Sequence, residues 1–344
     1  MSEKFSQFYD KNYKKTLLVP IVILVIALSF IVYTYFSTGD FLHKDVSLTG
    51  GTSITISSLV SPADVQKALS QKFSNIEVRS LSDNTGKQKQ IVVITSEAPE
   101  KIIPALEEYL GIKLDQKNSS TEYTGSSLGK NFYQQLMIAI TLAFFWMAAV
   151  VFVIFAQKWK IRILAIFLNF LFGIFLGKIF FNIPLIISMI IFLIFIVVLI
   201  YIYIKYSIPS FAVMFCAFAD IAMTLAVVDL IGMKLSGAGI VAFLMLIGYS
   251  VDTDILLTTR VLKRKNTSVN SEIFGSFKTG MTMTLTAIAA VAVSLFFVYS
   301  FETALNQMFT ILLIGLTFDT LNTWVTNTAL IKWFVENNSH GGNR

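Results

Sequence analysis

Long apolar runs alternate with short polar segments over most of the chain, and one polar stretch interrupts them near the amino end. A bilayer core is ~30 Å thick, so a spanning helix needs about 20 apolar residues. The runs that meet this length are 16–36, 132–157, 161–181, 184–204, 209–232, 238–260, 278–300 and 305–334. The pattern therefore predicts a polytopic α-helical membrane protein with about eight transmembrane helices.

The polar stretch, residues 37–131, has the pattern of a small folded domain. The segments "GTSITIS", "NIEVRSL" and "KQIVVITS" alternate as strands do, and the turn signal "SDNTGK" separates the last two. A helix is predicted from Pro62 behind Ser61, and another helix is predicted to end at Gly111. With a weaker strand near 113–123, the order β-α-β-β-α-β predicts a ferredoxin-like α+β domain.

Basic residues give the orientation of the spans. With eight spans, nearly all of the flanking lysines and arginines fall on one side: Lys4, Lys11, Lys14, Lys15, Lys158, Lys160, Arg162, Lys205, Arg260, Lys263, Arg264, Lys265, Lys278 and Lys332. The positive-inside rule makes that side cytoplasmic. We therefore expect a multi-pass protein of the cell (cytoplasmic) membrane, with residues 1–15 and 335–344 in the cytoplasm and the polar domain outside.

Composition agrees with a membrane protein and narrows its chemistry. Hydrophobic residues make up 55% of the 344 positions, charged residues 14%, and the mean hydropathy is +0.70, which is atypical of a soluble protein. The single cysteine, Cys216, excludes an intramolecular disulfide. His43 and His340 lie outside the apolar runs, so we expect neither a histidine proton relay nor a metal site, and no cofactor or nucleic-acid partner.

Four aspartates lie near the middle of predicted spans: Asp220, Asp252, Asp254 and Asp319. Placing each at the centre of a helix costs roughly 2.5–3.5 kcal/mol on insertion scales, so acids at this depth favour a functional site. The alternative is that they pair with polar neighbours and only fix helix packing. Asp229 lies near an outer helix end, where we expect it to be solvated.

Helical spacing groups these acids with other polar residues. Ser250, Asp254 and Thr258 share one face of the sixth span, whereas Asp252 points about 200° away with Tyr249 and Thr259. In the last span Asp319, Thr323 and Asn327 align, and in the seventh Thr279, Thr282 and Thr286 do. A proton relay of the four acids is the resulting hypothesis, with these supporting polar residues: Ser250, Thr258, Arg260, Thr282 and Thr323.

The third and fourth spans differ from the rest. From Ile163 to Ile204 the chain contains no acidic residue, and the second of the two spans is almost uniformly apolar. A uniformly apolar helix is typical of a lipid-facing position. We predict that this helix pair, about 161–204, lies outside the main bundle.

Several motifs resemble those of the SecF family of the protein-export machinery. "LTGGTSITIS" after the first span is similar to the family's "DFTGGT" strand, and "FDTLNTWVTN" is similar to its last span. The stretch from "YSIPSFAVMF" to "LIGYSVDTDILLTTRVLKRK" is very close to the archaeal form of the family. The resemblance covers most of the chain but implies six spans, so the helix pair at 161–204 would be an addition.

The resemblance implies a non-enzymatic subunit that acts with SecD and a SecYE-type channel on exported polypeptides, driven by proton movement through the membrane bundle. Asp252 matches the aspartate of a SecD motif, and Gly248 one turn earlier allows close helix approach, so we expect Asp252 to be the main titrating group and Asp254 to be its partner or a structural acid. Two alternatives remain open: a small-molecule or lipid transporter of the resistance-nodulation-division type, and a passive scaffold subunit.

Overall fold

The computed structural model describes residues 11–73, 76–82, 87–180, 182–264, 267–299 and 304–341. Within these ranges, eight helices are long and apolar enough to cross a membrane, which confirms the predicted fold class. They are α2 (Leu18–Thr38), α6 (Ser126–Phe155), α7 (Trp159–Ile174) with the π-helical turn η1 (Phe175–Ile179), α8 (Leu185–Tyr206), α9 (Ile208–Leu230), α10 (Gly237–Leu262), α11 (Val269–Val298), and α12 (Ala304–Leu321) continued by the π-helical segment η2 (Asn322–Asn327) and α13 (Thr328–Gly341).

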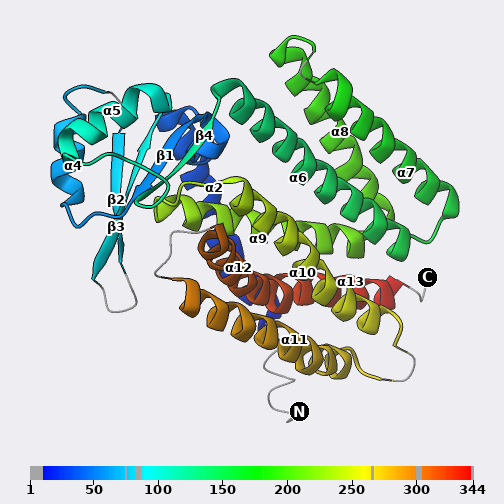
Figure 1. Ribbon diagram of the computed structural model, residues 1–344. Coiled ribbons are helices and arrows are strands. Elements are labelled where there is room, and N and C mark those ends of the chain that lie inside the picture. The colour runs from blue at the N-terminus through cyan, green and yellow to red at the C-terminus, as the bar shows by residue number, and fades with distance from the viewer. Residues whose placement is uncertain are drawn as a thin grey trace.

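The soluble domain is the predicted ferredoxin-like sandwich. Its strands are β1 (Gly51–Ile56), β2 (Ile76–Ser82), β3 (Gln88–Thr95) and β4 (Ser119–Thr124), paired antiparallel in the order β2-β3-β1-β4. Helices α4 (Pro62–Leu69) and α5 (Pro99–Leu110) cover one face, where alternate strand residues bury a core with Val65, Leu69 and Leu106 (Figure 1). The turn signal "SDNTGK" falls largely outside the described residues.

The segment that leads into this domain packs tightly against the bundle. A short helix, α3 (Val46–Thr49), leads from α2 into β1 and lies against the start of α6. The contact is so close that a Cβ on Gly129 would lie 2.7 Å from the backbone nitrogen of Gly50. Only glycine allows two backbones to approach in this way, so the domain has a fixed attachment at α6.

Helix α9 occupies the centre of the bundle, with contacts to α2, α6, α10 and the α12–η2–α13 helix. Helices α7 and α8 pack on α6 and the first residues of α9 through an aromatic cluster that includes Phe145, Phe152 and Phe172. They lie on the opposite side of the bundle from α11 and expose most of their apolar surface (Figure 1). This is the peripheral position expected for the added pair.

Candidate functional site

Three of the four intramembrane aspartates meet in the interior of the bundle. Asp220 comes from α9, Asp254 from α10 and Asp319 from α12, and each is at most 1% exposed. Asp254 interacts electrostatically with both of the other carboxylates, and Asp220 interacts with Asp319. We call these three residues the carboxylate cluster.

The π-helical segment η2 supplies a donor to each member of the cluster. Asn322 Nδ2 donates to Asp220 Oδ1 at 2.7 Å, and Asn327 Nδ2 donates to Asp254 Oδ1 at 2.8 Å. Thr323 Oγ1 lies 3.2 Å from Asp319 Oδ1 and donates to it. Three side chains of one six-residue segment therefore hold carboxylates from three different helices.

The wide turn explains how one segment faces so many neighbours. In a π-helix the backbone bonds run from residue i to residue i+5, which widens the turn and changes the direction of the following side chains. The Thr328 N–H bonds to the Thr323 carbonyl, and the Thr328 hydroxyl donates to the same oxygen at 3.0 Å. The wider turn lets Asn322 and Asn327 contact different helices, α9 and α10.

Two oxygens, one in the cluster and one on the neighbouring Asn327, have no donor among the described residues. Asp254 Oδ2 and Asn327 Oδ1 are both buried and make no hydrogen bond within that set. A buried acceptor without a donor is costly, and the cost is larger for a charged group. A proton bound to Asp254 would remove the charge and turn one of its oxygens into a donor.

Ser250 and Thr258, on the face of α10 that carries Asp254, are also buried. Ser250 Oγ donates to Asp220 Oδ2 at 2.6 Å, and Thr258 Oγ1 lies 3.5 Å from Asn327 Nδ2. Helical spacing thus grouped these residues correctly.

Buried apolar groups lie on both sides of the cluster along the bundle. On the side of the soluble domain, Leu235, Phe243, Leu246 and Ile311 pack with their neighbours into one buried group. On the opposite side, Leu257, Val261, Ile331 and Val335 form another, together with Ala212.

Asp252 lies elsewhere, contrary to the expectation that it joins Asp220 and Asp319. It is on the exposed face of α10 with Tyr249 and Gly248, and no described residue forms a hydrogen bond or ion pair with it. The reason is the angular separation from Asp254: once Asp254 faces α12, Asp252 must face outward.

Two supporting residues also lie outside the cluster. Thr282 is exposed on α11 and donates to the Lys278 carbonyl of its own helix at 2.8 Å. Arg260 is in the last turn of α10, where its guanidinium faces Gly275 of α11. Helix α11 turns other residues, including Gly280 and Thr284, toward the bundle, so its threonine stripe faces outward.

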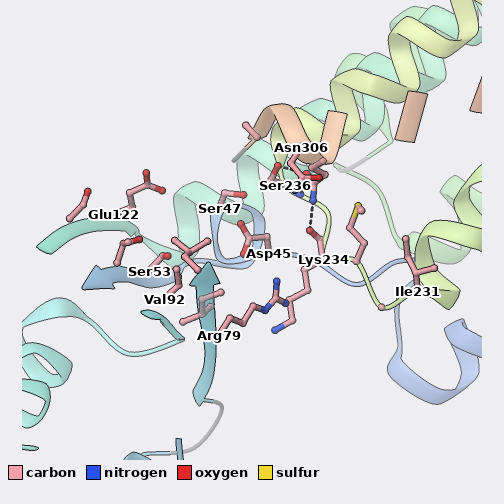
Figure 2. Close-up of a pocket in the computed structure, with 18 residues that line it drawn as sticks. Asp45, Ser47, Ser53, Arg79, Val92, Glu122, Ile231, Lys234, Ser236 and Asn306 are labelled. Carbon is pink, nitrogen blue, oxygen red and sulfur yellow. Dashed lines mark hydrogen bonds between the residues drawn. The ribbon is translucent and has the colours of Figure 1, made fainter. Parts of the chain in front are cut away.

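A cleft of about 790 Å³ separates the uncovered face of the sheet from the outer end of the bundle (Figure 2). Val92, Ile94 and Arg79 line it from the sheet, and Lys234 and Asn306 line it from the bundle. Lys234 crosses the cleft to form an ion pair with Glu77 of β2. Burial raises the pKa of Glu77, but the hydrogen bonds from Lys234 and Arg79 outweigh it, and the pKa lies below the ordinary value.

Sequence reasoning missed one polar contact at the outer end of the bundle. Asp229 is buried, with a side chain only 1% exposed, and His43 Nδ1 lies 2.5 Å from its Oδ1. The expectation that Asp229 is solvated is wrong, because the loop before the soluble domain folds back over the end of α9. The two residues are 186 positions apart, and no local pattern indicates such a contact.

Comparisons with known proteins agree with this architecture. The family model "Protein export membrane protein SecD/SecF, C-terminal" matches residues 176–337. The protein-export membrane proteins SecF of Methanothermobacter thermautotrophicus and Methanolacinia petrolearia are each 30% identical to the chain, over 95% of its length and 94% and 97% of theirs. SecF of Pyrococcus furiosus is 29% identical over 97% of this chain and 95% of its own.

Among solved structures, the chain is similar to SecDF of Thermus thermophilus, described as a translocon-associated membrane protein. The TM-score is 0.59 over 94% of this chain, at 14% sequence identity. This likeness shows a shared fold, and the chain spans 38% of that longer protein.

Proposed function

This chain belongs to the SecF family of protein-export membrane proteins, and from that premise we propose that it is a non-enzymatic subunit that acts with SecD and a SecYE-type channel on exported polypeptides. We further propose that proton binding at the carboxylate cluster drives its conformational change. The name of the SecF relatives supports the export role, and the description of the similar SecDF as translocon-associated supports the channel partner.

The observation that supports the proton-binding proposal is the burial of Asp220, Asp254 and Asp319 in one place. Among the described residues, they accept hydrogen bonds only from neutral donors. Three buried carboxylates that interact electrostatically repel one another strongly when all are ionised. We therefore propose that they share at least one proton and titrate as a set. Asp254, with its unpartnered Oδ2, is the group that we propose gains and loses this proton.

Proton occupancy would change helix packing, because ionised carboxylates repel one another and attract donors of η2. A proton that crosses the whole membrane potential releases ~2.3 kcal/mol per 100 mV. This is enough to shift a two-state equilibrium between closed and open helix arrangements. The clamp of α3 on α6 and the Lys234–Glu77 link would carry such a shift to the soluble domain.

We assign the SecD contact to the face of α10 and α11 that is exposed on the side of the bundle. Asp252 is exposed there at the depth of the bilayer, with Gly248 and Thr282 on the same two helices. A lipid tail cannot satisfy a carboxylate, so a neighbouring chain has to provide a cation or hydrogen-bond donor. Gly248 leaves room for a second helix, because a Cβ placed on it would have no atom of the chain within 4 Å.

Protein export with and without an imposed proton gradient tests the coupling. Asp254→Asn should abolish the stimulation by the gradient while the protein still assembles with SecD, since asparagine keeps the size but cannot titrate. Asp252→Asn should retain stimulation if SecD association survives. Full stimulation in Asp254→Asn would refute the proton role and favour a cluster that only packs helices.

Co-purification in mild detergent tests the partner face. Gly248→Leu should leave the isolated chain folded, because the space around Gly248 is open, yet it should reduce recovery of SecD severalfold. Ile190→Ala, on the exposed face of α8, is the control and should have no effect. Equal recovery of SecD from both variants would place the interface elsewhere.

A further inference from the structure

The loop that enters the soluble domain is pinned to the turn between α9 and α10. The Leu235 N–H donates to the His43 carbonyl at 2.7 Å, and the Asp45 N–H donates to the Leu235 carbonyl at 2.9 Å. Asp45 and the residues of this turn, among them Gly232 and Lys234, also line the cleft beneath the sheet (Figure 2). The contacts that hold this loop against the turn therefore also fix one wall of the cleft.

His43 and Asp229 lie directly at this junction. The Asp229 side chain is 1% exposed, whereas the His43 side chain is 40% exposed. An ionised Asp229 can only accept, so Nδ1, which faces it at 2.5 Å, then carries a hydrogen in both charge states of the ring. Nε2 is then the nitrogen that exchanges a proton with water. The other carboxylate oxygen, Asp229 Oδ2, is buried and has no hydrogen-bond partner among the described residues.

We propose that His43 and Asp229 form a proton-binding site at the outer end of the bundle, through which the pH outside the membrane sets how tightly the domain's root is held. A proton from water binds Nε2 and no other bond changes. The neutral ring becomes an imidazolium beside a buried carboxylate, and a polar contact becomes an ion pair.

Two other charged groups near the junction form an ion pair with each other. Lys44 forms an ion pair with Asp40, and its ammonium lies 4.6 Å from the centre of the Tyr133 ring on α6. Tyr133 also donates to Asp40 at 3.3 Å. Asp45 lies on the same loop and begins α3 as its N-cap residue.

On the side of the turn, the nearest cation is also engaged, because Lys234 pairs with Glu77 across the cleft. Imidazole is the side chain that ordinarily changes charge between pH 5 and 8, whereas carboxyl and ammonium groups ordinarily do not. We therefore assign the proposed pH response of this junction to the His43–Asp229 contact.

The sign of the response follows from the charges. While Nε2 carries a proton, the buried carboxylate has a counter-charge and the junction is tight. When Nε2 has lost that proton, the carboxylate keeps only a neutral donor, and the loop opens more often. An acidic exterior, as in a membrane that maintains an inward proton gradient, therefore favours the pinned state.

Amide hydrogen exchange of the full chain in lipid nanodiscs tests this, read as protection factors for segments 43–46 and 233–236. In the unmodified chain, protection should fall about two- to fivefold from pH 5.5 to pH 8.5, the size expected for an ion pair with one part-exposed partner. In His43→Gln the protection factors should be low and independent of pH. In His43→Arg, whose side chain is permanently charged, they should be high and independent of pH.

The controls separate this site from the proposed coupling mechanism. Asp254→Asn should keep the pH-dependent profile, because the carboxylate cluster is distinct from this junction. Glu77→Gln should change the level of protection but retain its fall with pH. A profile in His43→Gln that still falls as in the unmodified chain would overturn the proposal, as would low protection in His43→Arg at acidic pH.

Discussion

At the scale of residues, the three buried carboxylates accept hydrogen bonds from uncharged side chains. Asn322, Asn327, Thr323 and Ser250 hold the carboxylates without a positive charge. A lysine or arginine here would keep a carboxylate ionised, whereas an amide or hydroxyl bonds both the ionised and the protonated form. The donor set can therefore hold the acids in place in either protonation state.

This arrangement predicts an unusual mutational pattern. Asn327→Leu removes the donor of Asp254 and leaves a buried carboxyl group poorly satisfied, so it should destabilise the protein by about 1–3 kcal/mol. Replacing both partners, as Asn327→Leu with Asp254→Leu, should recover much of that loss, because two apolar groups need no partners. Thermal unfolding in detergent measures both, and a double variant that is less stable than the single one would contradict the pairing.

Helical spacing could predict part of this site. It placed Ser250, Asp254 and Thr258 on one face and Asp252 on another, and both groupings are found. Which of the two faces points inward depends on the neighbouring helices, and spacing along one helix contains no such information. Resemblance to a SecD motif favoured Asp252, but the donors Asn322 and Asn327 occupy the other side.

At the scale of elements, the last span was the least predictable. Its apolar run predicts one continuous helix over 305–334, whereas the structure inserts the π-helical segment Asn322–Asn327 in the middle. Local propensity does not distinguish a π turn from an α turn. Tertiary contacts do, since Asn322 and Asn327 bond to acids on two other helices. The peripheral position of α7 and α8, in contrast, was predicted from the absence of acidic residues in both helices and the uniform apolarity of α8.

The position of α7 and α8 predicts that they are dispensable for assembly. Ser210 Oγ at the start of α9 donates to the Val151 carbonyl near the end of α6 at 3.3 Å, so a short linker can join these helices. Deleting about 161–204 would expose Phe145 and Phe152 only to lipid, which is as apolar as the lost neighbours. The shortened protein should insert and still co-purify with SecD, and its failure to bind SecD would instead make the pair part of the interface.

At the scale of the whole molecule, the basic residues predict both termini and the loop after α10 in the cytoplasm, and the soluble domain outside. Single cysteines at Ser82 in β2 and at Ser268 before α11 should therefore react oppositely with an impermeant thiol reagent in intact cells. Cys216→Ala removes the only native thiol, which is buried. Equal labelling of the two positions would exclude this topology.

The fold class followed from the sequence because it depends on local patterns: the lengths of apolar runs and the alternation of strands. The way in which the soluble domain sits on the bundle did not follow, because its contacts join distant segments. His43 contacts Asp229, and Glu77 forms an ion pair with Lys234, but no sequence pattern in these segments predicts either contact. These contacts explain why the outer surface of the bundle was the least predictable part of the molecule.

The Lys234–Glu77 link predicts how the domain responds to strong acid. The pKa of Glu77 is lowered in the folded protein, so the stabilisation is complete above the unfolded value, about 4.3, and is lost as the pH falls through the lower folded value. Between pH 5 and 8 this link is therefore constant, unlike the His43–Asp229 contact.

Spin labels at Ser120 and Asn306, which line opposite sides of the cleft, would report the spacing between domain and bundle. At pH 7 the distance distribution should be broader in Glu77→Gln than in the unmodified chain, because the variant lacks the ion pair. As the pH falls through the lowered pKa of Glu77 the two distributions should converge, since protonation of Glu77 removes the same interaction. Glu108→Gln breaks an exposed pair with Lys72, away from the cleft, and should leave the distribution unchanged. Equal widths for Glu77→Gln and the unmodified chain at pH 7 would mean that the other contacts between the domain and the bundle hold the domain in place without this ion pair.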